Sequence, residues 1–362
     1  MMSDEIYYKV AKVLDTLPNG FPSTASGVEI KLLKKVFTPE QADLFCGMRL
    51  TFETVEEIAS RTERPLKGLK ELLMTMAKSG QLMTIKLGGG RFFKMLPWVF
   101  GIYEFQLGRM DREFAELVEV YWPVYSQQFF AKKPQLMQTL AIEEVIPFHQ
   151  EALPYQKVST IIENGQSFLV NECICKKERG LLDKPCDKPT DVCLAIAPIP
   201  GVFDKSPLGR VISKDEAYAL LNKAEEAGLV HLTGNVQVGQ IYICNCCKCC
   251  CGVLRAINDF NMPASMVINS HYYAEINAEL CIGCGVCADE RCQVKAIEET
   301  GDTYRVIQDR CIGCGLCIGY CPAEAIQLVH KDQAALVPPP LTEDDWFRER
   351  GRMRGVDFTA HK

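Results

Sequence analysis

The pattern of apolar and polar positions in the first 100 residues, with its capping and turn signals, predicts short helices followed by a β-hairpin. Residues 38–41 (TPEQ) and 54–57 (TVEE) are capping boxes, in which an N-cap threonine precedes a glutamine or glutamate three residues later. A third helix is predicted over 65–78, because a glycine follows its last turn. The apolar runs 82–87 and 91–95 flank three glycines, which predicts a hairpin.

This order of elements, over residues 25–96, resembles a winged helix-turn-helix domain. Residues 1–100 carry 14 Lys and Arg against 11 Asp and Glu, which permits DNA binding. The third helix, however, offers lysines but no Arg, Asn or Gln to read base edges. Its leucines and methionines suit packing against protein. We therefore expect residues 1–100 to form a winged-helix-like docking domain.

The remaining pattern predicts an α+β protein of several domains. Residues 101–153 are expected to form a helical connector whose aromatic side chains pack on their neighbours. Residues 154–270 are expected to form a cysteine-rich α/β domain, with one helix before Gly165 and another from the capping box at 213–216 to Gly228. Residues 271–330 form a further domain, and a proline-containing linker with a polar tail follows at 331–362.

The cysteine content changes this picture most. Of 19 cysteines, all but Cys46 lie between residues 173 and 321. Disulfide-dense domains are small and secreted, whereas this sequence shows neither a secretory leader nor an apolar stretch long enough to cross a membrane. Metal ligation in a reducing cytoplasm is therefore the better interpretation. The net charge of −6 argues against nucleic acid as the main partner.

Two segments that begin 30 residues apart, at 281 and 311, nearly copy each other: CIGCGVCADERCQ and CIGCGLCIGYCP. The second matches the run C-x2-C-x2-C-x3-C-P and resembles bacterial-type two-[4Fe–4S] ferredoxin domains. The resemblance implies that each cluster takes three ligands from one repeat and the fourth from the other. The first cluster would be held by Cys281, Cys284, Cys287 and Cys321, and the second by Cys311, Cys314, Cys317 and Cys292.

The first repeat departs from the family run, because four residues instead of three precede Cys292 and Gln293 replaces the proline. This departure predicts unequal surroundings for the two clusters. Zinc is the alternative metal for paired C-x2-C elements.

Ten further cysteines match no standard motif: Cys173, Cys175, Cys186, Cys193, Cys244, Cys246, Cys247, Cys249, Cys250 and Cys251. They are candidate ligands for one or two further iron–sulfur clusters or for zinc. Adjacent residues of a strand point to opposite faces, so Cys246 and Cys247 are not expected to serve one metal unless the chain kinks. The first four of these cysteines (173–193) form one set and the last six (244–251) another. We expect thiols of the two sets to combine into two clusters, which leaves two thiols beyond the eight that two clusters need.

The layout resembles iron–sulfur proteins of anaerobes that carry a dicluster-ferredoxin domain, a winged-helix-like N-terminus and a cysteine-rich middle domain. That resemblance implies electron transfer.

No dinucleotide-binding loop, Walker motif or HExxH is present, so no catalytic residue is assigned. The prediction is a single-electron carrier for a larger oxidoreductase, with a flavoprotein or metal-cofactor subunit as partner. A redox-sensing DNA-binding regulator and a stand-alone reductase with a middle-domain cluster remain alternatives. The arginines and Trp346 of the tail could clamp a partner or lie in solvent.

Overall fold

The computed structural model describes residues 4–147, 152–204, 206, 208–332 and 336–362, and it divides the chain into two compact units. The first comprises residues 1–129, 181–183 and 347–362, and the second comprises residues 130–180 and 184–346. No helix in the described part of the chain is long and apolar enough to cross a membrane.

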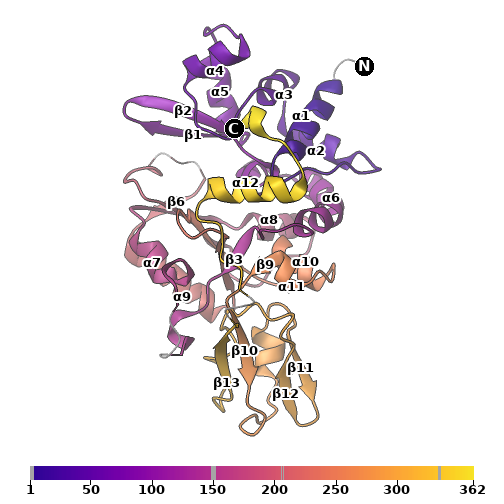
Figure 1. Ribbon diagram of the computed structural model, residues 1–362, viewed down its shortest axis with the longest axis vertical. Helices are drawn as coiled ribbons and strands as arrows, with labels where there is room; N and C mark the ends of the chain where they lie inside the picture. Colours follow the sequence, from indigo (N-terminus) through magenta and orange to yellow (C-terminus); the bar gives the residue numbers. More distant parts are fainter. Residues whose placement is uncertain (1–3, 148–151, 205, 207, 333–335) are drawn as a thin grey trace. The chain divides into compact units, whose positions relative to one another are not determined.

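The first unit is mainly helical and ends its N-terminal half in a hairpin (Figure 1). Its elements are α1 (Glu5–Thr16), α2 (Val28–Val36), α3 (Pro39–Cys46), α4 (Val55–Thr62), α5 (Leu69–Lys78), β1 (Leu82–Leu87), β2 (Gly90–Met95), α6 (Arg112–Phe130) and most of α12 (Glu343–Arg354). Both predicted capping boxes are confirmed at α3 and α4, and so is the hairpin. The third helix begins at Leu69, later than predicted, because Gly68 before it has a left-handed backbone with φ +83°.

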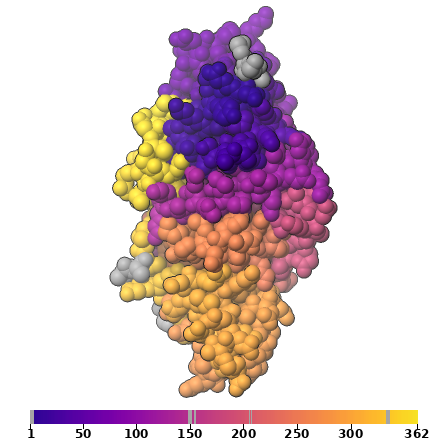
Figure 2. Space-filling view, turned by 90° about the vertical axis from the view of Figure 1, so that its right-hand side faces the viewer, coloured from indigo at the N-terminus to yellow at the C-terminus, as the bar shows by residue number. Residues whose placement is uncertain are grey.

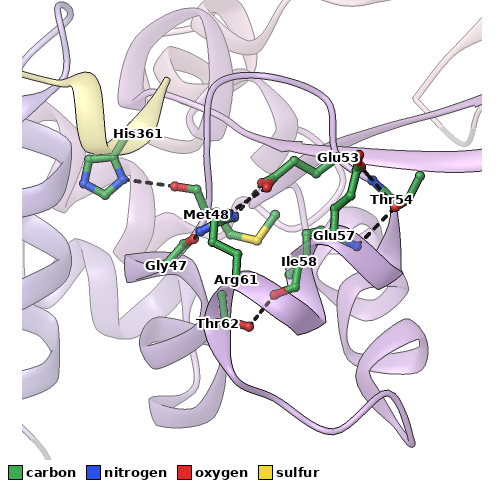
Figure 3. A network of polar contacts seen from close by, with 9 residues as sticks. All are labelled: Gly47, Met48, Glu53, Thr54, Glu57, Ile58, Arg61, Thr62 and His361. Carbon is green, nitrogen blue, oxygen red and sulfur yellow. Dashed lines mark hydrogen bonds and ion pairs between the residues drawn. The ribbon is translucent and has the colours of Figure 1, made fainter.

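Polar contacts fix α4 against the segments beside it (Figure 3). Arg61 forms an ion pair with Glu53 and also donates to the carbonyl of Gly47. The imidazole Nδ1 of His361 lies 3.0 Å from the carbonyl oxygen of Met48. The last residues of the chain are therefore part of this unit's packing.

The C-terminal segment was expected to be a polar tail, and this expectation was wrong. Residues 343–354 form helix α12, in which Trp346 is buried and Arg350 is fully buried. The indole Nε1 of Trp346 donates to the Gln135 carbonyl over 2.8 Å, and the Arg350 guanidinium donates to the Phe129 carbonyl. Because these side chains are held by their own chain, they do not form a free clamp for a partner.

The second unit is built on a seven-stranded sheet in the order β6-β4-β5-β8-β7-β3-β9. Its strands are β3 (Met137–Thr139), β4 (Ser167–Glu172), β5 (Asp191–Ala197), β6 (Arg210–Ile212), β7 (Val230–Gly234), β8 (Tyr242–Cys246) and β9 (Ile268–Asn269). All neighbours are antiparallel except β3 and β9. The helices are α7 (Val158–Glu163), α8 (Ile174–Leu181), α9 (Lys214–Glu226), α10 (Gly252–Asn258) and α11 (Ala264–Val267).

Helices α7 and α9 cover one face of this sheet with a continuous apolar core (Figure 1). Leu194 and Ile196 of β5 and Ile243 of β8 point into that core. Since side chains alternate along a strand, the neighbouring residues of β5 and β8 point to the other face. That alternation determines where the cysteines of these strands lie.

The remainder of the second unit consists of two small antiparallel ribbons. One pairs β10 (Tyr272–Ile276) with β13 (Ile326–His330), and the other pairs β11 (Ile297–Thr300) with β12 (Thr303–Val306). The segment that carries α10 and α11 lies beside these ribbons in both Figure 1 and Figure 2. The Asn258 amide donates to the carbonyl of Gln293 over 3.0 Å, which joins α10 to the ribbon segment.

Candidate metal centre

Four cysteines line a cavity between the two ribbons: Cys281, Cys284, Cys287 and Cys321. Three of them come from the loop after β10, and the fourth comes from the loop before β13. Apolar side chains of Ile276, Ile326 and Val286 complete the wall. The space is therefore surrounded by soft ligands and apolar groups, as an inorganic cluster requires.

A second cavity is lined by Cys292, Cys311, Cys314 and Cys317. Ala274, Ile312 and Leu316 contribute its apolar wall, and the arginine before Cys292 also lines it. Each cavity thus combines three cysteines of one repeat with one cysteine of the other. Burial raises the pKa of the Cys314 thiol to about 12, so a free thiolate is disfavoured there unless a metal binds it.

The additional residue before Cys292 is absorbed by a wide helical turn. Residues Cys287–Arg291 form a π-type turn, in which the Cys292 amide bonds to the Cys287 carbonyl, five residues back, over 3.0 Å. In the shorter second repeat, the amide of Cys321 bonds instead to Ile318, three residues back. The wider turn brings Cys292 to a position equivalent to that of Cys321.

Backbone amides point at the sulfur atoms in both halves. The Ala296 amide donates to Cys292 Sγ over 3.1 Å, and the Ala325 amide donates to Cys321 Sγ over 3.3 Å. Each donor lies four residues after its cysteine. The fourth cysteine of each cavity, Cys292 or Cys321, is therefore held in the same way. Such N–H···S bonds stabilise thiolates and tune the potential of a bound cluster. The Ala274 amide donates to Cys311 Sγ over 3.3 Å in the same manner.

Residues 274–328 match a 4Fe-4S dicluster domain. The match spans both cavities and all eight of their cysteines, and it supports iron–sulfur clusters as their occupants. Neither the search of curated proteins nor the search of solved structures gave a match. The segment 274–328 is called the dicluster domain below.

The ten cysteines of the middle segment divide into two groups, and each group mixes the two sequence sets. The first group is a tetrad, whose sulfur atoms all lie within 4.8 Å of one another: Cys186, Cys247, Cys249 and Cys250. The sulfur of Cys186 lies 3.7 Å from that of Cys247 and 3.4 Å from that of Cys249. Three members belong to the turn between β8 and α10, where the chain reverses and lets close neighbours converge.

The dimensions of the tetrad fit one metal ion. The Cys249 sulfur lies 3.3 Å from that of Cys247 and 3.6 Å from that of Cys250. Thiolates bound to one tetrahedral zinc at about 2.3 Å lie about 3.8 Å apart. The thiolates of a four-iron cube are bound to four different irons and must lie farther apart. The geometry therefore favours zinc, or another single ion, at the tetrad.

The other six sulfurs form a closed ring of neighbouring contacts, and this group is called the six-sulfur ring. Following the contacts around it, the members are Cys173, Cys175, Cys251, Cys246, Cys244 and Cys193, and Cys193 returns to Cys173. Residues Cys173, Cys246 and Cys251 are buried, and the other three are partly buried.

The sheet and two helix starts assemble the ring. On β5, Cys193 is adjacent to the core-facing Leu194. On β8, Cys244 follows the core-facing Ile243, and Cys246 lies two residues further on the same face as Cys244. These three cysteines therefore point away from the α7–α9 core. Cys173 and Cys175 lie at the start of α8, and Cys251 is the N-cap of α10. Cys246 belongs to the ring and Cys247 to the tetrad, since successive residues at the end of the strand diverge.

A buried lysine supplies positive charge to both groups. Lys176 is buried, and its ammonium donates to the carbonyl of Pro189. Hydrogen bonds from Cys249 and Cys250 lower the pKa of the Cys247 thiol, and the charge of Lys176 lowers it further. Contacts with Cys175 and Cys193 lower the pKa of Cys173, to which Lys176 also contributes. Lysines are mostly exposed, so nothing in the sequence distinguished this one.

The residue that replaces the ferredoxin proline connects the dicluster domain to the tetrad. The Gln293 side-chain oxygen accepts the amide of Lys248 over 3.0 Å, and Lys248 lies between Cys247 and Cys249. The Arg291 guanidinium donates to the carbonyls of Glu225 and Glu226 at the end of α9 over 2.7 and 3.1 Å. The departure from the family run therefore makes the contact between two cysteine centres.

Proposed function

We propose that this chain is an electron-transfer component of a larger anaerobic oxidoreductase. The observation that carries the proposal is the pair of four-cysteine cavities in the dicluster domain, each with N–H···S bonds to its sulfurs. Cys281, Cys284, Cys287 and Cys321 would hold one [4Fe–4S] cluster, and Cys311, Cys314, Cys317 and Cys292 the other. A bound cluster of this kind accepts and releases one electron.

The surroundings of the first cavity suit a protein partner. Cys284 is exposed, and the side chains of Leu280 and Ile282 beside it are 52% and 66% exposed. Exposed apolar side chains around a redox centre provide a small docking surface. A flavoprotein or a metal-cofactor subunit of an oxidoreductase is the partner class we propose.

The second cavity differs from the first in charge. Arg291 lines it, and its guanidinium stacks 3.5 Å from the centre of the Tyr320 ring and donates to backbone carbonyls. This fixed positive charge favours the added negative charge of reduction. The hydrogen bond between Gln293 and Lys248 then leads from this cavity toward the middle cysteines. The proposed role is thus transfer between a surface partner and the middle centres.

The regulator alternative has weaker support. Lys67, one of the basic residues of the predicted recognition helix, precedes the observed start of α5 at Leu69. Arg61, an arginine in the same region, is engaged with Glu53 and Gly47 (Figure 3). We therefore propose docking to protein for residues 1–100.

The test is metal analysis and electron paramagnetic resonance of the full chain purified without air, before and after reduction. We expect at least about eight irons per chain, a signal from reduced clusters, and one-electron re-oxidation by an acceptor such as cytochrome c. Cys314→Ala should lose the iron of the second cavity, whereas Cys46→Ala, outside every cysteine group, should lose none. A colourless, zinc-filled dicluster domain would contradict the proposal. Salt-sensitive, sequence-selective DNA retention would support the regulator.

A further inference from the structure

The sulfur atoms of the tetrad converge in a way that those of the dicluster domain do not. Four of their separations are 3.3, 3.4, 3.6 and 3.7 Å, and all four sulfurs lie within 4.8 Å of one another. In the part of the chain that the structure describes, no three of the eight dicluster cysteines come this close together. The spacing suits one ion at the centre, and four thiolates complete a tetrahedral shell without an open position for a substrate.

The four thiols join two segments that are distant in the sequence. Cys186 comes from the segment between α8 and β5, and the other three come from the turn between β8 and α10, which starts 61 residues later at Cys247. The Cys251 amide donates to the Cys247 carbonyl over 3.1 Å and closes this turn. Four soft thiolates in a closed tetrahedral set are typical of structural zinc. An ion that joins the two segments closes a long loop and fixes the turn in place.

Lys248, in the middle of this turn, contacts the dicluster domain on both sides of Cys292. Its amide donates to the side-chain oxygen of Gln293 over 3.0 Å, and its ammonium donates to the carbonyl of Asp289 over 3.3 Å. Asp289 lies in the π-type turn before Cys292, and Gln293 follows Cys292 directly. Gln293 is 1% exposed, and its Nε2 donates to the carbonyl of Arg291 over 3.3 Å, which holds its side chain in this orientation. The two contacts of Lys248 therefore set the position of Cys292.

The equivalent cysteine of the first cavity, Cys321, is held within its own loop. Its amide donates to the Ile318 carbonyl over 3.0 Å, and Pro322 follows it where the first repeat has Gln293. A proline has no side-chain acceptor that could receive an amide from the tetrad turn. The first cavity therefore serves as an internal control for any effect that the tetrad has on the second.

We propose that the tetrad binds one structural zinc ion, and that this zinc positions Cys292, the fourth cysteine of the second cavity, through the contacts of Lys248. The zinc holds the turn in place, and Lys248 transmits that position to Gln293 and Asp289 on either side of the cysteine. The role of Cys292 as a cluster ligand rests on the proposed function, whereas the zinc site and its link to residues 287–293 do not.

The first measurement is zinc and iron per chain for the full chain purified without air. One zinc per chain is expected, and X-ray absorption at the zinc edge should show four sulfur neighbours at about 2.3 Å. The double variant Cys186→Ala/Cys249→Ala leaves two ligands and should lose the zinc, whereas Cys46→Ala, outside every cysteine group, should keep it. A chain without zinc, or zinc that survives the double variant, would overturn the zinc site even if the dicluster domain holds about eight irons.

The second measurement is hydrogen exchange of the unaltered chain before and after a chelator removes the zinc, and again after zinc is restored. Peptides that cover residues 287–293 should exchange roughly tenfold faster without zinc and recover with it, whereas peptides that cover 318–325 should not change. In Gln293→Ala, which keeps all four tetrad ligands, this response to zinc should shrink, because one of the two contacts is gone. If exchange over 287–293 is the same with and without zinc, the positioning role is wrong.

The two measurements also separate this inference from the proposed function, because neither depends on bound iron. With clusters present, zinc removal should change the electron paramagnetic resonance signal of one reduced cluster while the iron count stays constant. A chain that binds zinc and shows the exchange response without holding iron would contradict the proposed function alone. A chain with about eight irons whose residues 287–293 do not respond to zinc would contradict this inference alone.

Discussion

The close packing of the second-cavity loop on strand β10 gives a sharp prediction for Gly313. Gly313 has φ +60°, and a Cβ atom at this position would lie 2.2 Å from the backbone oxygen of Tyr272. Gly301, in the turn between β11 and β12, has nearly the same φ, +63°, but has nothing within 4 Å of that position. The two alanine variants therefore share the backbone strain and differ in the steric overlap.

The expected size of the effect follows from these contacts. An L-residue in the left-handed region costs about 1–2 kcal/mol in either variant. Ordinary contact begins at 3.4 Å, so Gly313→Ala requires a displacement of roughly 1.2 Å. Tyr272 is held by its pairing with His330, so the loop that carries Cys311 and Cys314 must move. Metal–ligand distances tolerate only about 0.2 Å, so we expect the second cavity to lose its iron.

The assay is iron per chain with electron paramagnetic resonance on both variants, purified without air. Gly313→Ala should lose about four irons and the magnetic coupling between two reduced clusters. Gly301→Ala should keep all its iron and lose only about 1–2 kcal/mol of stability. If Gly313→Ala keeps its full iron content, or if both variants lose iron equally, the packing argument is wrong.

Three further predictions test the other contacts. Gln293→Ala leaves the Lys248 amide without its acceptor, which costs about 1–3 kcal/mol, so zinc should leave the tetrad faster in a chelator assay while dicluster iron stays. Arg350→Ala should lower the free energy of unfolding by about 2–4 kcal/mol in denaturant titrations, whereas exposed Arg352→Ala should cost under about 0.5 kcal/mol; equal effects would contradict the burial of Arg350. Burial, then the charges near it, lowers the pKa of His271 to about 4 from an ordinary 6.5, so the unfolded state binds more protons between these values. Stability is therefore full above about pH 6.5 and falls by roughly 3 kcal/mol toward pH 4, and thermal unfolding of His271→Phe should lack that part of the pH dependence.

Local signals predicted the local structure well. The capping boxes at α3, α4 and α9 and the hairpin at β1–β2 depend on side-chain-to-backbone bonds within a few residues, and all are present. The prediction for the C-terminal segment was wrong for the opposite reason, because its structure depends on contacts distant in the sequence. Its charged sequence reads as a solvated tail, yet Arg350 is buried on a backbone carbonyl far away in the sequence. Long arginine side chains bury their stems whenever such a carbonyl is in reach, and no local pattern shows that.

The spacing of the ten middle cysteines in the sequence could not predict that they divide into a group of six and a group of four. It depends on strand register: Leu194 pairs with Ile243, which brings Cys193 and Cys244 to the same place on one face of the sheet. It also depends on where β8 ends. If the strand continued one residue further, Cys247 would be part of the extended strand instead of the turn that brings it to the tetrad. The period of two did predict that Cys246 and Cys247 part.

The departures of the first repeat show how a local irregularity can carry function. In the regular run, a proline follows the fourth ligand and cannot donate or offer a side-chain acceptor. Here the wide turn at Cys287–Arg291 returns Cys292 to its cavity, and Gln293 is left free to accept the Lys248 amide. Through Gln293, the irregular repeat of the dicluster domain contacts the loop that carries Cys247 and Cys249 of the tetrad.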